Sequence, residues 1–272
     1  DLLVSIGGGS LTDAAKMVQL CLRHDVRDVA ALDAYRIVVA ADGTQQRPRL
    51  EAPRVRMISV PTTLSAGDFN PLAGCTDPRH HVKQSFMHPL LVPRAVILDP
   101  ALTVHTPEWV WLSTGMRAVD HAVEALCSPD CNAYTEGAAR QALRLLGEGL
   151  PRSKARADDL EGRQLCQLGM WLSMAGREAN VPMGASHAIG HVLGGTCGVP
   201  HGYTTCVMLP HVLRYNRSFN AERQAIVSEA LGRPGQDAAQ VVGDIIAALG
   251  LPRTLREVGV GPERFREVAE QS

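Results

Sequence analysis

The sequence has few aromatic residues and almost no net charge. Each of these features excludes some classes of protein. Phe, Trp and Tyr make up 4% of the 272 residues, so the core must be built mostly from Leu, Val, Ala and Ile. The formal net charge of -1 leaves no global basic excess for binding nucleic acid or an anionic membrane. A hydrophobic content of 45% and a charged content of 20% are typical of a soluble globular protein, and the length predicts a large core and two domains.

Long apolar runs, a signal peptide and paired cysteines are also missing. No stretch is long and apolar enough to span a bilayer, and the start lacks the charged and apolar regions of a signal peptide. The seven cysteines are odd in number, scattered and without a CxxC pair, which predicts reduced thiols in a cytoplasmic protein rather than a disulfide or zinc framework. The sequence opens without Met in a strand pattern and stops within a helical one, which predicts a fragment of a longer protein.

Strand patterns and a Gly-rich turn characterise the first hundred residues. Residues 2–6 form a β-rich apolar run typical of a buried parallel strand, and residues 11–22 have helical periodicity. The other patterns of this part are a short strand at 36–40, strands at 55–60 and 95–98, and a turn-rich hairpin at 74–81. Together they predict part of an α/β nucleotide-binding domain.

Beyond Pro107 every pattern favours helix. The predicted helices cover residues 109–127, 133–149, 158–179, 184–193, 201–216, 221–231, 238–249 and 263–269. We therefore expect the C-terminal part of an α/β Rossmann-like domain over residues 1–105, followed by an all-helical domain over residues 106–272.

The Gly-rich turn is the first candidate for binding. Gly7, Gly8, Gly9 and Ser10 follow a strand and open a helix, where backbone N–H groups and the helix N-terminus suit a pyrophosphate. A tight turn without a ligand explains the same residues equally well. Asp13 and Lys16 follow in the first turns, either beside the ligand or on an exposed helix face.

Two hydroxyls at another strand end form the second candidate. Thr62 and Thr63 lie at the carboxyl end of a predicted strand, where ligands bind in open α/β sheets. Their hydroxyls can bond a phosphate or nicotinamide, or make a local turn or helix cap. Lys83 can meet a ribose or phosphate, although a solvated lysine is the simpler interpretation.

The spacing of three histidines in the helical part predicts that their side chains converge. His187 and His191 are one helical turn apart and project from one face, and His201 follows a Gly-Gly break in a Pro-His-Gly turn. Such a set can meet at one metal ion or at one reacting carbonyl. Upstream, Arg117 and His121 share a helix face, which adds a fourth histidine to the set.

The ordered motifs resemble the iron-containing (group III) alcohol dehydrogenase family over essentially the whole length. The matching elements are GGGSxxDxAK at 7–16, PTT at 61–63, DPxL at 99–102, GMxAxxHxxE at 115–124, HxxxHxLGxxxxxPHG at 187–202 and LPHVxxYN at 209–216. The resemblance implies a dehydroquinate synthase-like fold, with NAD(H) or NADP(H) bound in the cleft between the two domains. It also implies a small-molecule substrate, a homodimer, and first strands and last helices that are not present here.

Whether this chain can hold the metal ion of the family depends on one position. In metal-dependent members an Asp and three His hold the ion, and the three His correspond to His121, His187 and His201. The Asp position, four residues before the first of these, is Arg117. Arg cannot ligate a dication, and a +1/+2 pair 5 Å apart costs roughly 6–7 kcal/mol at an effective dielectric near 20. One branch, maleylacetate reductase, lacks that Asp and works without metal, and the runs HVLGGTCGVPH and HAVEAL resemble it.

The leading hypothesis is therefore an NAD(P)H-dependent enzyme that reduces a maleylacetate-like keto-dicarboxylate without metal. Arg117 and the histidines would stabilise the developing oxyanion, or Arg117 would clamp a substrate carboxylate, and His191 would donate the proton. Asp120 is expected to point away from the face of His121. Three alternatives stay open: an alcohol or polyol dehydrogenase with Fe or Zn on the three His, a lyase of the dehydroquinate synthase type, and a truncated chain that folds poorly.

Overall fold

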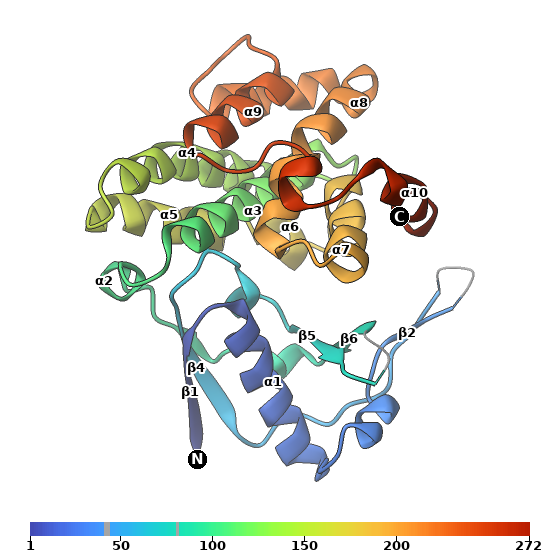
Figure 1. Ribbon diagram of the computed structural model, residues 1–272. Helices are drawn as coiled ribbons and strands as arrows, with labels where there is room; N and C mark the ends of the chain where they lie inside the picture. The colour runs from blue at the N-terminus through green and yellow to red at the C-terminus, as the bar shows by residue number, and fades with distance from the viewer. Residues whose placement is uncertain (41–43, 80–81) are drawn as a thin grey trace. The chain divides into compact units, whose positions relative to one another are not determined.

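The computed structural model describes residues 1–40, 44–79 and 82–272, apart from the side chain of Lys83 (Figure 1). By internal packing the chain divides into two compact units. Unit 1 comprises residues 1–62 and 66–99, and unit 2 comprises residues 63–65 and 100–272. The domain boundary expected near residue 105 stays a prediction, because packing alone does not show whether either part folds by itself.

The centre of unit 1 is a parallel sheet. Strands β1 (Leu2–Gly7), β4 (Arg56–Pro61) and β7 (Ala95–Val96) lie in the order β1-β4-β7, which confirms the strand patterns at 2–6, 55–60 and 95–98. Parallel strands need a crossover connection, and the chain between β1 and β4 begins with helix α1 (Gly9–His24), which packs on both strands (Figure 1). The strand-turn-helix unit predicted from the Gly-rich turn is therefore present.

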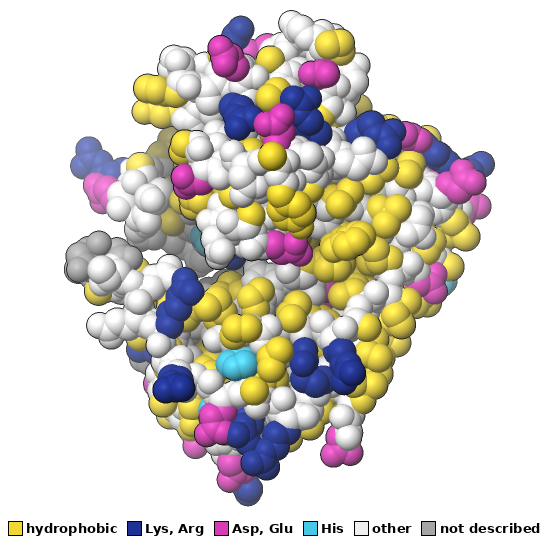
Figure 2. Space-filling view, turned by 180° about the vertical axis from the view of Figure 1, so that it is seen from behind, with side chains coloured by type: hydrophobic (Ala, Val, Ile, Leu, Met, Phe, Trp, Pro, Cys, Tyr) yellow, Lys and Arg dark blue, Asp and Glu magenta, His cyan; other side chains and the backbone are white. Residues whose placement is uncertain are grey.

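The prediction that β1 is buried is wrong in part. Its alternate side chains Leu2, Val4 and Ile6 are 52%, 61% and 54% exposed. Successive side chains of a strand point to opposite faces, and Ser5, on the other face, is buried. In the described part of unit 1 nothing covers the face that carries the three apolar residues. Figure 2 shows hydrophobic side chains exposed over large areas of one side of the molecule.

The described residues of unit 1 also form two antiparallel ribbons and three short 3-10 helices. Strand β2 (Val38–Val39) pairs with β3 (Gln45–Gln46), and β5 (Leu72–Asp77) pairs with β6 (Val82–Met87), in the region where a hairpin is predicted. The 3-10 helices are η1 (Ala30–Ala34), η2 (Gly67–Phe69) and η3 (Pro89–Leu91). A core of Met17, Leu20, Ala73, Phe86 and Leu91 joins α1 to β5, β6 and η3.

Unit 2 consists of helices, and its described residues hold no strand, so the predicted fold class is confirmed. The helices are α2 (Pro100–Thr103), α3 (Glu108–Cys127), α4 (Ala133–Ala155), α5 (Leu160–Leu172), α6 (Ala175–Glu178), α7 (Ala185–Cys197), α8 (His201–Ala230), α9 (Ala238–Ala248), η4 (Arg256–Val258), η5 (Pro262–Arg264) and α10 (Phe265–Gln271). Within the described ranges, none of the helices has the length and apolar character that crossing a membrane requires.

Helix α3 is the central helix of unit 2. Every residue from Gly115 to Leu126 is buried, because α4, α5, α6 and α8 all pack against this helix. Polar side chains on any side of this segment therefore face other helices rather than solvent. This burial decides where the candidate site lies.

Two buried thiols and one partly buried thiol lead us to expect a loss of stability at alkaline pH. Burial raises the pKa of Cys127, Cys166 and Cys206 to about 12, above the ordinary value of 9.0. The stability that these neutral thiols contribute is complete below pH 9 and is lost as the pH rises towards 12, because only the unfolded chain releases the protons. Each thiol should lower the free energy of unfolding by about 1.4 kcal/mol per pH unit in this window.

The measurement is urea unfolding of the parent protein and Cys166→Ala between pH 9 and 11. Removing one titrating thiol should make the decline shallower by about 1.4 kcal/mol per pH unit. Lys16 acts in the opposite direction, since burial lowers its pKa to about 8, but it is the same in both proteins and cancels in the comparison. Parallel declines in the two proteins would contradict the prediction.

Candidate functional site

The four predicted histidines form two stacked pairs on helices α3, α7 and α8. The rings of His121 and His187 are buried, with centroids 4.9 Å apart at an angle of 27°. The rings of His191 and His201 are exposed, with centroids 5.5 Å apart at 26°. The close packing of α8 on α3 depends on Gly202, since a Cβ there would lie 2.7 Å from the Cβ of Ser113.

Two carboxylates hold the inner nitrogen of His187. Its Nδ1 lies 2.6 Å from Oε2 of Glu124 and 3.3 Å from Oδ2 of Asp120. The remaining ring nitrogen, Nε2, is buried with no hydrogen-bond partner among the described residues, and the same holds for Nδ1 of His121. Each of the two buried rings thus keeps one nitrogen that is unused by the protein.

The carboxylates are themselves held by donors from α7 and α8. Glu124 accepts hydrogen bonds from the backbone N–H groups of Gly184 (2.8 Å) and Ser186 (2.7 Å). Asp120 accepts from the hydroxyls of Ser186 (2.9 Å) and Thr205 (2.8 Å). The result is a continuous buried network from α3 to the start of α7 and to α8.

Burial makes the imidazoles neutral and weakens the acidity of the carboxyl groups. It lowers the pKa of His187 to about 4, although the neighbouring Asp120 acts to raise it, and it lowers the pKa of His121 well below its usual value. Burial also raises the pKa of Asp120 to about 6 and raises that of Glu124. At neutral pH the two buried histidines therefore contribute hydrogen-bonding nitrogens and no positive charge.

Sequence reasoning missed Asp120 and Glu124. Asp120 was expected only to point away from the face of His121, and its contact with His187 was not foreseen. The contact forms because α3 is enclosed by other helices, so a residue 100° round from His121 faces α7 and α8. Spacing could have found both, since Glu124 is three residues after His121 and four after Asp120, which places it beside each on the helix.

Arg117 is a buried cation beside this network. Its Nη1 is buried without a hydrogen-bond partner, and in the described part of the chain it makes no ion pair. Burial lowers its pKa to about 10, and Asp120 and Glu124 act to raise it, so the guanidinium remains charged at neutral pH. The exposed Arg177 on α6 adds a second positive charge close enough to lower the pKa of Arg117.

An iron ion, which the resemblance implies, would lie beside the buried Arg117. Among the described residues, one group places three potential ligand atoms within 4.8 Å of one another, and it consists of Asp120, Glu124 and His187 rather than the three predicted histidines. Both carboxylate oxygens of Glu124, Oδ2 of Asp120 and Nδ1 of His187 take part in hydrogen bonds within the protein. Oδ1 of Asp120 and Nε2 of His187 are buried with no partner among the described residues. The position expected to hold the fourth ligand carries the Arg117 guanidinium, which cannot ligate and repels a dication.

The Gly-rich turn of unit 1 has the geometry of an anion site. Gly7 ends β1, Gly8 is the N-cap of α1, and no side chain caps the helix. The first turn carries no acidic residue; Ser10 is exposed there, and Asp13 follows half-buried. These features fit a pyrophosphate, and the cofactor roles of Gly7, Gly8, Gly9, Ser10 and Asp13 stay predictions.

Lys16 is a structural residue. Its side chain is fully buried, and Nζ donates to the carbonyls of Gly67 (2.7 Å), Asn70 (2.6 Å) and Leu72 (2.8 Å). It joins α1 to the segment that leads into β5. Both sequence interpretations, a ligand contact and an exposed helix face, are therefore wrong for Lys16.

The remaining predicted cofactor contacts are Thr62, Thr63 and Lys83. The backbone N–H of Thr62 donates to the carbonyl of Gly7, which continues the pairing of β1 with β4. Thr63 is buried, and its hydroxyl donates to Oγ of Ser65 (3.3 Å). The side chain of Lys83 lies outside the described residues. The binding roles of all three stay predictions.

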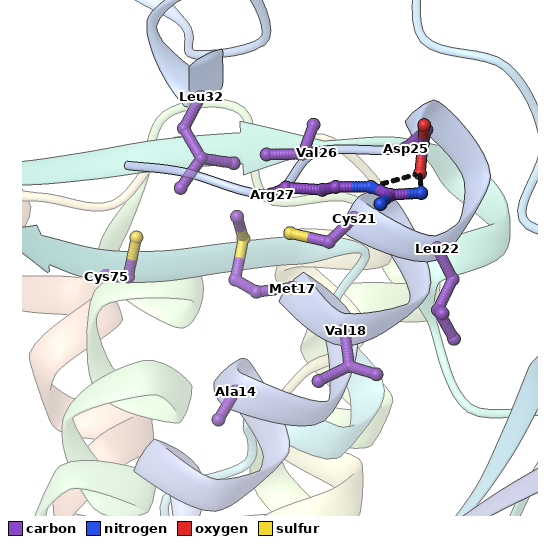
Figure 3. Close-up of a pocket in the computed structure, with 10 residues that line it drawn as sticks. All are labelled: Ala14, Met17, Val18, Cys21, Leu22, Asp25, Val26, Arg27, Leu32 and Cys75. Carbon is purple, nitrogen blue, oxygen red and sulfur yellow. Dashed lines mark hydrogen bonds and ion pairs between the residues drawn. The ribbon is translucent and has the colours of Figure 1, made fainter. Parts of the chain in front are cut away.

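Each unit also has an open cavity. The one in unit 1 has a volume of about 560 Å³ and is lined mainly by apolar residues of α1, including Met17, Cys21 and Leu22, with Leu32 and Cys75 opposite (Figure 3). It includes none of the predicted site residues. The one in unit 2, about 790 Å³, is lined by Glu124 and Gly184 and therefore reaches the carboxylate that holds His187.

Comparisons with known proteins agree with the geometry. The model of the iron-containing alcohol dehydrogenase family matches residues 1–100, and that of the Fe-containing alcohol dehydrogenase family, C-terminal, matches residues 111–272. The chain is 34% identical to dehydrogenase ALT3 of Alternaria alternata, over 100% of the chain and 77% of that protein. The crystal structure of maleylacetate reductase from Rhizobium sp. has a TM-score of 0.81 at 29% identity, over 100% of this chain and 67% of that one. The crystal structure of a 1,3-propanediol oxidoreductase has a TM-score of 0.85 at 30% identity, over 100% and 70%.

Proposed function

Because the chain belongs to the iron-containing alcohol dehydrogenase family and is thereby an oxidoreductase, we propose that it reduces a keto-acid with NADH or NADPH and without a bound metal ion. The observation that carries this proposal is the buried, charged and incompletely hydrogen-bonded guanidinium of Arg117. The resemblance to maleylacetate reductase, a protein whose name states reduction of a keto-acid, supports the same substrate class.

Arg117 supplies the positive charge of the site. A guanidinium presents N–H donors in a planar fork that matches a carboxylate or a developing oxyanion. In a buried environment such a charge stabilises an oxyanion more strongly than it would in water, and it is already in place before the reaction. The unpartnered Nη1 of Arg117 provides the donor for this contact.

The histidines divide the other tasks between them. When bound, the nicotinamide cofactor supplies the hydride. His121 and His187 are neutral, so they orient the substrate through hydrogen bonds rather than through charge. Hydride addition to a carbonyl or C=C–C=O carbon leaves an alkoxide or an enolate. His191, exposed beside His201, supplies the proton that this anion takes up.

A second function is favoured by the two buried imidazole nitrogens that have no partner. Nδ1 of His121 and Nε2 of His187 have the chemistry of metal ligands. With His201 they are the set expected of a metal-dependent alcohol or polyol dehydrogenase that holds Fe or Zn. The similarity to 1,3-propanediol dehydrogenases is consistent with that alternative.

A paired assay separates the two functions. The purified protein is given maleylacetate with NADH or NADPH, or a simple alcohol with NAD or NADP, each with and without a chelator. We expect keto-acid reduction that the chelator leaves unchanged, and no stoichiometric iron or zinc. Alcohol oxidation that is lost together with a bound metal would establish the alternative. In the same assay His191→Asn should lower kcat by about 100-fold, with the exposed His211→Asn as control.

A further inference from the structure

Glu124, which has no role in the proposed function, connects the start of α7 to the ring of His187. It forms the hydrogen-bonded start of α7, and it contacts the ring of His187 at 2.6 Å. The two residues are 63 positions apart in the sequence, and their hydrogen bond joins α3 to α7. Glu124 is buried and is one of the residues that line the cavity of unit 2.

The donors around Glu124 determine which atom of His187 carries the proton. Oε2 accepts the N–H of Gly184, and Oε1 accepts the N–H of Ser186, so both oxygens act as acceptors. An ionised carboxylate can only accept, so the partner of Oε2 on the ring is Nδ1–H. Asp120, whose Oδ2 lies 3.3 Å from the same nitrogen and accepts two hydroxyls, favours the same tautomer.

The lone pair of His187 is thereby placed on Nε2. That atom is buried and has no partner in the described part of the protein. A carboxylate that holds the far nitrogen of an imidazole sets both the orientation and the tautomer of the ring, and it raises the basicity of the free nitrogen.

We propose that Glu124 is a positioning residue of the reaction: it holds His187 in the Nδ1–H tautomer, so that Nε2 accepts a hydrogen bond at the reacting centre. This inference rests on the proposed function in taking His187 as part of the active site. The packing around Glu124 leaves the carboxylate little freedom, since a Cβ on Gly184 would lie 2.8 Å from its Oε1.

The central test replaces Glu124 with Gln. The amide cannot accept at both ends, so one of its three donors loses its partner or the ring of His187 turns to the Nε2–H tautomer. We expect kcat to fall by about 10- to 100-fold with a much smaller change in KM, for whichever substrate the parent protein turns over. The matched control is Glu222→Gln, an exposed glutamate of the same cavity, which should leave kcat unchanged.

Two readouts separate positioning from a loss of folding. Nitrogen NMR of labelled protein without substrate should show the Nδ1–H tautomer of His187 in the parent and its loss in Glu124→Gln. Glu124→Ala opens the site to the adjoining cavity, so added formate should restore kcat towards the parent value. If Glu124→Gln fails to fold, Gly184→Ala, which displaces the carboxylate, should show the same fall in kcat and the same change of tautomer.

Three results would overturn the inference: an Nε2–H tautomer in the parent protein, an unchanged kcat in Glu124→Gln, or a fall in kcat without a change of tautomer and without rescue by formate. Failure of the proposed function looks different. It appears as alcohol oxidation or metal dependence in the parent protein, while the tautomer and the effect of Glu124→Gln on that activity remain measurable.

Discussion

Replacing Arg117 with Ala should lower kcat/KM for keto-acid reduction by about 100- to 1000-fold, the usual effect of losing an electrostatic group that faces a developing oxyanion. The reason is that Arg117 is the buried cation of the site, while its neighbours His121 and His187 are neutral. Steady-state kinetics with the keto-acid measures the effect. The exposed Arg214→Ala is the matched control and should leave both kinetic constants unchanged.

Arg117→Asp should reverse the charge at this position of the site. It removes the cation and places a carboxylate four residues before His121. We expect this variant to bind one Fe or Zn ion, which metal analysis of the purified protein detects, and to lose keto-acid reduction. If Arg117→Ala keeps full activity, or if the parent protein itself holds a stoichiometric metal that activity requires, Arg117 does not have the proposed role.

The largest expected effect on stability comes from a glycine in α4. A Cβ on Gly149 would lie 2.6 Å from the carbonyl oxygen of Gly162 and 2.7 Å from Sγ of Cys166. The first of these atoms belongs to the backbone of α5, so Gly149→Ala must push α4 and α5 apart. Overpacking of this kind costs about 1–3 kcal/mol, and loss of the tight α4–α5 contact places this site at the upper end.

Gly137, in the same helix, is the matched control. A Cβ there would have no atom within 4 Å, so Gly137→Ala should stabilise the protein by about 0.5–1 kcal/mol through helix propensity. Urea unfolding at neutral pH measures both variants. Equal stabilities of Gly149→Ala and Gly137→Ala would show that α5 moves without cost and would contradict the packing argument.

The pattern of elements could be predicted well, because it depends on neighbouring residues. The strand, Gly-rich turn and helix around Gly7 follow from a short apolar run and from the need of the chain to reverse. The helices of unit 2 follow from apolar periodicity, although their ends shift: α4 extends to Ala155, beyond the predicted end at residue 149. Each of these features is encoded within a few residues of where it occurs.

Burial was harder to predict, because it depends on partners that are distant in the sequence. The sequence pattern allows Lys16 to be an exposed helix residue. In the structure, carbonyls more than fifty positions away accept hydrogen bonds from its ammonium group. The apolar run of β1 predicts a buried strand, but half of its side chains are exposed. A helix or strand pattern identifies the apolar faces but does not say which of them another element covers.

The sequence by itself determined the family and the order of elements, and it predicted the four histidines and Arg117 as site residues, because the spacing of motifs can be recognised without knowledge of the packing. Only the tertiary structure decided which atoms of those residues are available. The hydrogen bonds of Glu124 and Asp120 to α7 and α8 span 60 to 85 positions, and they exist because α3 is enclosed by other helices. That enclosure makes His121 and His187 neutral, assigns Nδ1 of His187 to a carboxylate, and leaves Arg117 as the buried positive charge.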